Sequence, residues 1–461
     1  MITPSTEPSL TGLLNDLQEA RERTLELIED LTDEQMIGPR LAIVNPLRWE
    51  IGHVGWFQEY WILRHYRRQM PIGADRDRLY DSAAVAHDTR WDLLLPSKAE
   101  TVAYIQQILK RVVEGEGRGP LGEPDRYNEA YFIRLALLHE YMHAEAITYT
   151  RQTLGYPPPR IRITGRSSSE GEKDQLSTTG MERPTDDSGP DLGDAEIPGG
   201  TFHLGSTPDM PFVFDNEQWA HPVTVKAFRM ARGAVTNREF AAFVEDEGYK
   251  RREFWTDAGW IWRETAGAEH PVYWQNQGGG RWLRRNFDAW VSLEPRLPVL
   301  HVNWHEADAY CRWARRRLPT EAEWEFAAGA ERGQGNRPIE SKLEYPWGEG
   351  PANADRANLE WRRMGCLPVD ALPAGENAFG CRQMIGNVWE WTATDFGPYP
   401  GFSPGPYKEY SAPWFGDHKV LRGGCWVTRP ALIRNQYRNF YQPHRRDVWA
   451  GFRTCALTDR T

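Results

Sequence analysis

The sequence predicts an α+β protein in which a four-helix bundle is followed by a domain with little regular secondary structure. In the first third of the chain, apolar residues recur at helical spacing. Beyond a polar stretch at residues 167–193, short apolar pieces alternate with Gly, Pro and Trp. The length of 461 residues also exceeds what one ordinary core holds. We therefore expect more than one domain.

Four segments of the first third have the helical pattern, and they cover residues 10–31, 46–68, 98–113 and 128–154. Asn45 is expected to cap the second helix, with Pro46 at its first position. Gly155 and the prolines that follow it end the fourth helix. Helices joined in this way by loops predict an antiparallel bundle over residues 1–165.

The composition changes after the bundle. Residues 166–193 are polar, acidic and poor in apolar side chains, which predicts a flexible linker. The second domain is expected over residues 194–461, with helices at 237–245, 305–316 and 321–328. Short strands and long ordered loops are expected elsewhere in this domain.

Composition also limits the class of function. The formal net charge of -10 disfavours a nucleic-acid partner. The first ten residues lack the pattern of a signal peptide, and no apolar run approaches a membrane span. Five scattered Cys without a CxxC pair predict neither a disulfide framework nor a thiolate zinc site. We expect a cytoplasmic enzyme for small molecules, as a monomer or homodimer, with no membrane partner.

Three histidines form the clearest candidate site. His139 and His143 are four residues apart in the fourth helix, so both can bind one metal ion. Their HExxH pattern is typical of zinc hydrolases, in which Glu140 would be the general base. His53 lies on the second helix, and bundles build metal sites from facing helices. Neutral imidazoles suit iron, zinc or copper, and the spacing alone does not choose among them.

At this point the chain resembles a known family. The segments PLRWEIGHVGWF and HEYMHAE resemble the DinB-like domain of the ergothioneine-biosynthesis sulfoxide synthases. The segments IPGGTFHLGS, VTNREF, RLPTEAEWEFAA, YPWG, GNVWEWT, VLRGG and GFR resemble the formylglycine-generating-enzyme (sulfatase-modifying-factor) domain, which is C-type-lectin-like. The resemblance covers nearly the whole chain outside the linker, in the order found in the synthases.

The resemblance implies a mononuclear non-haem Fe(II) site made by His53, His139 and His143, with O2 as co-substrate. It implies hercynine, the trimethylated betaine of histidine, as the acceptor, bound between the two domains. The reaction would join sulfur or selenium to carbon 2 of the imidazole ring.

The resemblance also assigns substrate-site residues in the second domain. Tyr407 falls on the tyrosine proposed as the proton donor, and a phenol that stays protonated suits that role. Asn439 would face the betaine. Phe440 would contact its trimethylammonium group by cation–π attraction, and Tyr410 would add to this aromatic box. Without the resemblance, these aromatic residues would be read as core or loop residues.

The chain departs from the family in the donor site, where carboxylate donors need guanidinium groups. Where the family has paired arginines, the stretch from Asp81 to Pro96 offers only Arg90. Tyr441 replaces an Asp that pairs with the donor's ammonium group, and Met142 replaces a Gln before the third histidine. These changes favour a neutral selenosugar, as in the selenoneine synthases. Arg445 is retained and keeps gamma-glutamylcysteine or cysteine open as the donor.

Other functions remain as alternatives. The HExxH pattern allows a zinc hydrolase or thiol transferase, which would leave the second domain without a task. A non-catalytic reading, in which the second domain binds a ligand, has no need of three histidines. Cys425 and Cys455 do not form the cysteine pair of the formylglycine generators, so copper-dependent cysteine oxidation is not expected.

Overall fold

The computed structural model describes residues 9–73, 75–115, 127–162, 191–329 and 343–457. Four long helices form the N-terminal bundle: α1 (Leu10–Glu26), α3 (Leu47–Gln58), α5 (Lys98–Glu114) and α6 (Glu129–Leu154). Helix α6 packs against α1 and α3, and α3 also packs against α5. Most of the predicted linker, up to residue 190, lies outside the described residues.

Local sequence signals explain most helix ends. The Ser9 side chain accepts a hydrogen bond from the Gly12 N–H at the start of α1, and Ser97 forms a capping box with Glu100 in α5. Asn128 caps α6, which ends at Gly155 with a φ of 66°. Helix α1 ends at Glu26, earlier than the apolar spacing indicated.

The predicted cap at Asn45 is wrong. The N-cap residue of α3 is Pro46, and no side chain caps this helix. The Asn45 side chain instead donates to Glu50 Oε2 and accepts from Arg90. Helix α3 continues as the π-helix η1 (Glu59–Tyr66), which widens the turn beyond the part of the helix that carries His53. Short helices α2 (Asp33–Ile37) and α4 (Arg76–Tyr80) complete this part of the bundle.

The C-terminal domain contains small sheets. One has the order β1-β4-β13-β8, and a second has the order β11-β10-β9-β12. Their bounds are β1 Asp194–Ile197, β4 Phe228–Ala231, β13 Cys455–Ala456, β8 Arg316–Arg317, β11 Asn439–Tyr441, β10 Lys419–Arg422, β9 Trp389–Asp395 and β12 Ala450–Gly451. Two further sheets consist of β2 (Gly200–Leu204) with β3 (His221–Val225), and of β5 (Trp274–Asn276), β6 (Trp282–Asn286) and β7 (Ala289–Ser292).

Helices α7 (Asn237–Glu245), α9 (Trp304–Trp313) and α10 (Glu321–Gly329) occupy the three segments for which helices were expected. The helix predicted to reach residue 316 ends earlier because β8 begins there. Helix α8 (Asp257–Ala266), capped by Thr256, was not predicted. The described residues thus form a helical N-terminal domain and a mixed C-terminal domain, as the sequence predicted.

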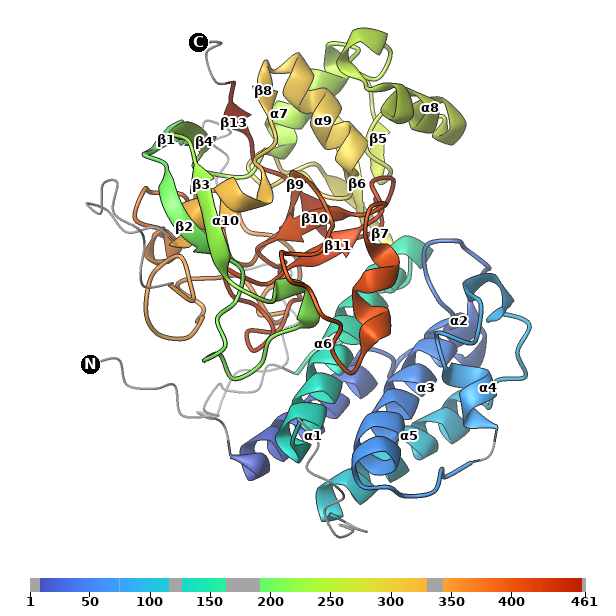
Figure 1. Ribbon diagram of the computed structural model, residues 1–461. Coiled ribbons are helices and arrows are strands. Elements are labelled where there is room, and N and C mark those ends of the chain that lie inside the picture. Colours follow the sequence, from blue (N-terminus) through green and yellow to red (C-terminus); the bar gives the residue numbers. More distant parts are fainter. Residues whose placement is uncertain (1–8, 74, 116–126, 163–190, 330–342, 458–461) are drawn as a thin grey trace, which may run out of the picture.

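Helix α6 lies along the boundary between the bundle and the C-terminal domain (Figure 1). The Glu145 carboxyl group in this helix accepts from Trp389 Nε1 at 2.6 Å and from Thr428 Oγ1 at 2.8 Å. Burial raises the pKa of Glu145, and these two donors oppose that shift. Trp361 Nε1 donates to Thr148 Oγ1 one turn further along. One helix therefore carries two of the predicted ligands and docks the second domain.

Among the described residues, no helix is both long enough and apolar enough to cross a membrane.

Candidate metal centre

The three predicted histidines lie together. His53 is on α3, and His139 and His143 are on α6, where residues four apart share a face. One ring nitrogen from each histidine lies within 4.8 Å of the others. Such a cluster within the bundle can hold one metal ion and leave coordination positions open for other ligands.

Hydrogen bonds orient two of the three rings. His53 Nδ1 lies 2.7 Å from the Tyr80 carbonyl oxygen, and His143 Nδ1 lies 2.6 Å from Glu50 Oε1. Both partners are acceptors, so each Nδ1 carries a hydrogen and Nε2 is the nitrogen of each ring that can bind a metal ion. His139 Nε2 lies 3.1 Å from His143 Nε2. Two of the rings thus have the tautomer that a metal ion requires at Nε2.

Burial favours the neutral form of His53 and His139. It lowers the pKa of His53 to about 3, and the neighbouring His143 lowers it further. Burial also lowers the pKa of His139 well below its usual value, with contributions from His143 and His53. The His139 ring stacks on Phe57 with centroids 3.6 Å apart. Neutral imidazoles held close together fit a transition-metal ion.

The glutamate of the HExxH pattern does not belong to this site. Glu140 is fully buried and accepts from Arg21 Nε at 2.8 Å, from Thr24 Oγ1 at 2.8 Å and from Gln58 Nε2 at 2.6 Å. These partners come from α1 and from the end of α3. The carboxylate is therefore part of the bundle interior, and it does not face the histidines as a general base would.

The C-terminal domain brings Tyr407 to the cluster. The residue precedes the short helix η6 (Lys408–Tyr410). Its ring centroid lies 4.9 Å from that of Phe57 and 6.1 Å from that of His139. Burial raises the pKa of Tyr407, with a further contribution from Glu409. Its hydroxyl group is therefore protonated at neutral pH.

Met142, next to His143 in α6, contacts two tyrosines of the C-terminal domain. Tyr410 Oη lies 3.4 Å from Met142 Sδ and 3.2 Å from Tyr437 Oη. Tyr437 Oη lies 3.5 Å from the same sulfur. The family resemblance predicts Met142 and Tyr410 in the substrate site but gives no role to Tyr437. Its position in the RNQYRNF segment offered no signal beyond aromatic richness.

Asn439 and Phe440 lie on β11. The Phe440 ring stacks on Phe396 at 3.9 Å and contacts Tyr410 edge-on at 5.6 Å. Asn439 Oδ1 accepts from the Phe440 backbone N–H at 2.8 Å. Phe440 thus contacts Tyr410, which lies beside Met142.

The predicted donor-site arginines both have partners. Arg445 forms a two-pronged pair with Asp447, at 2.7 and 2.6 Å, and its guanidinium carbon lies 5.2 Å from the Tyr441 ring centroid. Arg90 is 8% exposed and lies 3.7 Å above the ring of Trp49. It donates to Asn45 Oδ1 and to the Val85 carbonyl oxygen. Both guanidinium groups therefore already donate to groups of the protein, and neither has two N–H groups free side by side for a carboxylate.

Glu50 is a site residue that the sequence analysis missed. It is 4% exposed and lies one helical turn before His53. Burial alone would raise its pKa, but His143 and Asn45 offset that effect and lower it. The available signal in the sequence was a carboxylate three residues before a candidate metal-binding histidine, because residues at this spacing lie on the same face of a helix.

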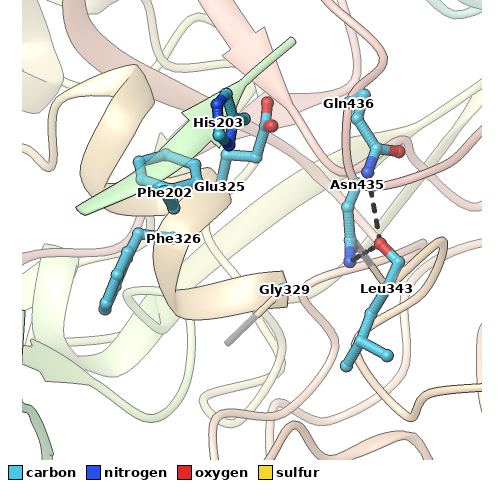
Figure 2. Close-up of a pocket in the computed structure, with 8 residues that line it drawn as sticks. All are labelled: Phe202, His203, Glu325, Phe326, Gly329, Leu343, Asn435 and Gln436. Carbon is cyan, nitrogen blue, oxygen red and sulfur yellow. Dashed lines mark hydrogen bonds between the residues drawn. The ribbon is translucent and has the colours of Figure 1, made fainter. Parts of the chain in front are cut away.

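Two hollows among the described residues lie apart from the histidine cluster. One lies within the C-terminal domain and is lined by Phe202, His203, Glu325, Phe326, Gly329, Leu343, Asn435 and Gln436 (Figure 2). The amides of Asn435 and Gln436 both donate to the Leu343 carbonyl oxygen there. None of the predicted site residues lines this hollow.

Comparisons with known proteins match two parts of the chain to two different families. Residues 16–147 match the DinB superfamily, and residues 186–457 match the sulfatase-modifying factor enzyme 1-like domain. A hercynine oxygenase of Mycolicibacterium thermoresistibile is 35% identical, over 98% of this chain and 96% of the relative. A hercynine oxygenase of Mycolicibacterium smegmatis is 34% identical, over 96% of this chain and 97% of the relative. A formylglycine-generating enzyme of Mycobacterium tuberculosis is 35% identical but covers only 54% of this chain and 89% of itself.

Fold and site together define a two-domain protein in which a DinB-like bundle presents a three-histidine cluster to a sulfatase-modifying-factor domain. Two formylglycine-generating enzymes, by contrast, match only 54% and 53% of this chain. The chain belongs to the hercynine oxygenase family of ergothioneine biosynthesis. This confirms the family resemblance seen in the sequence.

Proposed function

We propose that this protein is an oxidative synthase that joins sulfur or selenium to imidazole carbon 2 of hercynine. Fe(II) would be held by His53, His139 and His143, with O2 as co-substrate. The observation that carries the proposal is the near-complete alignment with hercynine oxygenases, combined with the three-histidine cluster that the fold assembles.

The reaction balances with one O2 per turnover. A carbon–hydrogen bond of hercynine and the X–H bond of the donor are replaced by a carbon–X bond, where X is sulfur or selenium. One oxygen atom is transferred to X, and the other leaves as water with the two hydrogens. Fe(II), when bound, supplies the redox chemistry that this four-electron reduction of O2 needs.

The chain's own residues would bind hercynine and supply a proton. Tyr407 lies beside His139 and keeps its hydroxyl proton, so it can donate a proton during O2 reduction. Tyr410 and Phe440 present rings that can contact a trimethylammonium cation. Asn439, next to Phe440 on β11, can hydrogen-bond the betaine carboxylate.

The hydrolase alternative has little support in the site. A zinc hydrolase of the HExxH type needs the glutamate beside the metal as general base. Glu140 is instead held by Arg21, Thr24 and Gln58. The second domain would also have no role in such a mechanism.

For the donor, we infer a neutral molecule such as a selenosugar. A carboxylate donor needs a free guanidinium fork. Arg90 is bonded to Asn45 and Val85, and Arg445 is paired with Asp447. Gamma-glutamylcysteine or cysteine remains the alternative, in which Arg445 would exchange Asp447 for the donor.

Metal analysis and oxygen uptake test the main proposal. Protein purified without oxygen should take up Fe(II) and consume O2 only when hercynine and a donor are both present. Bound zinc with no O2 consumption would favour a hydrolase. A protein that binds no metal would contradict both enzymatic readings. Turnover measured with each donor alone then tests the donor inference, which fails if gamma-glutamylcysteine gives the highest kcat/KM.

A further inference from the structure

Two of the three histidines are linked to the same guanidinium group. His143 Nδ1 donates to Glu50 Oε1 at 2.6 Å, and Glu50 Oε2 accepts from Asn45 Nδ2 at 2.6 Å. Asn45 Oδ1 accepts in turn from Arg90 Nη1 at 2.5 Å. The Asn45 amide thus accepts from a guanidinium through Oδ1 and donates to a carboxylate through Nδ2 at the same time. The four residues form an unbroken chain of donors and acceptors.

Trp49 lies between the same guanidinium group and the ring of His53. Arg90 lies 3.7 Å above the ring of Trp49, and Trp49 stacks on His53 with centroids 4.9 Å apart and planes 8° apart. Trp49 is fixed by its own hydrogen bond to the Leu79 carbonyl oxygen. The neighbouring Tyr80 carbonyl oxygen contacts His53 Nδ1. The His53 ring is thus held on its face and at its edge.

The residues behind the two histidines are buried, so their contacts restrict the orientation of the histidine rings. Trp49, Glu50 and Arg90 are 1%, 4% and 8% exposed. Buried polar groups keep their partners because an unsatisfied group is costly. Partners behind metal-binding histidines fix the tautomer and the ring orientation.

We propose that Arg90, Asn45 and Glu50 form a positioning chain that aims Nε2 of His143 at the metal, while Arg90 and Trp49 fix the ring of His53. Arg90 then acts behind the ligands instead of binding the donor. This inference rests on the proposed function in that it requires a metal ion at the three histidines, but it does not require turnover.

Co(II) binding tests the chain without catalysis. The dissociation constant is measured by competition with a chelator, and the visible spectrum reports the ligand geometry. Arg90→Gln, Asn45→Leu and Glu50→Gln should each weaken Co(II) binding by about 10- to 100-fold. The control is Arg40→Gln, because Arg40 contacts the same loop through Asp92, with side chains 52% and 64% exposed. The control should bind Co(II) like the wild type.

A double variant separates a chain from independent packing effects. If the chain reaches His143 through Glu50, then Asn45→Leu with Glu50→Gln should bind Co(II) no more than about threefold more weakly than Glu50→Gln alone, because Arg90 also acts on His53 through Trp49 and Asn45 belongs to the chain alone. Fully additive losses would overturn the chain, because coupled residues give non-additive effects. Where Arg90→Gln does not fold, Arg90→Lys keeps the buried cation but loses the planar guanidinium group, and it should likewise weaken Co(II) binding.

Other results also decide the inference. Arg90→Gln could instead bind Co(II) with the affinity and spectrum of the wild type and raise only the KM for the donor. That result would make Arg90 a substrate-binding residue and overturn the proposal. A wild-type protein that binds Co(II) but does not convert hercynine would refute only the proposed function, since the affinities still test the chain. Failure of the wild type to bind Co(II) would refute both.

Discussion

Arg21 Nε donates to Glu140 Oε1 across 2.8 Å in the interior of the bundle, with both side chains almost completely buried. This ion pair shows that the glutamate of the HEYMH segment points away from the histidines. The two histidines of the segment face His53, while the glutamate between them connects α6 to α1. One short motif thus supplies metal ligands on one side and a structural ion pair on the other.

The first prediction concerns Glu140. Replacing it with Gln leaves Arg21 buried beside a neutral partner, and breaking a buried pair costs about 3–5 kcal/mol. We expect a lower free energy of unfolding in denaturant titrations and an unchanged dissociation constant for Fe(II). A variant of normal stability that has lost turnover would show that Glu140 is a catalytic base after all.

The second prediction concerns His139. His139→Ala removes one of three ligands from the centre, so we expect Fe(II) binding and hercynine-dependent O2 consumption to be abolished. Metal content by elemental analysis and an oxygen electrode give both readouts. His203→Ala, which changes a histidine of the hollow in Figure 2, is the matched control and should retain both activities. Full activity in His139→Ala would overturn the site assignment.

The third prediction concerns Tyr407. Tyr407→Phe should keep Fe(II) bound but lower kcat about 100-fold or redirect the O2 chemistry, because a positioned proton donor contributes on that order. Tyr345→Phe changes another tyrosine of the C-terminal domain, one that stacks on Trp347, and serves as the control. Steady-state kinetics with product analysis make the comparison. Unchanged kinetics in Tyr407→Phe would remove this residue from the mechanism.

The fourth prediction concerns pH and the metal-free protein. Burial lowers the pKa of His53 and His301 from 6.5 to about 3. Between these values the unfolded chain binds more protons than the folded one, so stability is present above pH 6.5 and is lost as pH falls. Each histidine contributes about 1.4 kcal/mol per pH unit within this window.

The variant His301→Asn isolates one of these contributions. His301 has a φ of 60°, a conformation that Asn tolerates well. Chemical denaturation at pH 7 and pH 5 should show a smaller loss of stability in His301→Asn than in the wild type. Equal losses in the two proteins would mean that His301 titrates normally when folded.

The sequence predicted those features that depend on spacing along the chain. Four-residue spacing placed His139 and His143 on one face of α6, and Gly155 marked the end of that helix. The two-domain division followed from the change in composition and from the motifs of each part. These signals are local, so they are visible without knowledge of packing.

Features that depend on side-chain direction were not predictable in the same way. Asn45 precedes a helix and has the residue type of an N-cap, but its side chain is used by Glu50 and Arg90. The convergence of Tyr410 and Tyr437 on Met142 joins residues more than 260 positions apart. Such contacts arise from the docking of the two domains, which leaves no periodic signal in the sequence.

A donor competition followed by mass spectrometry tests the central claim most directly. Fe(II)-loaded protein would receive hercynine deuterated at carbon 2, O2, and equal amounts of selenosugar, thiosugar, gamma-glutamylcysteine and cysteine. We expect a main product in which selenium from the selenosugar has replaced the deuterium. A gamma-glutamylcysteine or cysteine adduct would keep the hercynine reaction but contradict the donor inference. Hercynine recovered with its deuterium, alongside iron-loaded protein, would contradict the proposed function itself.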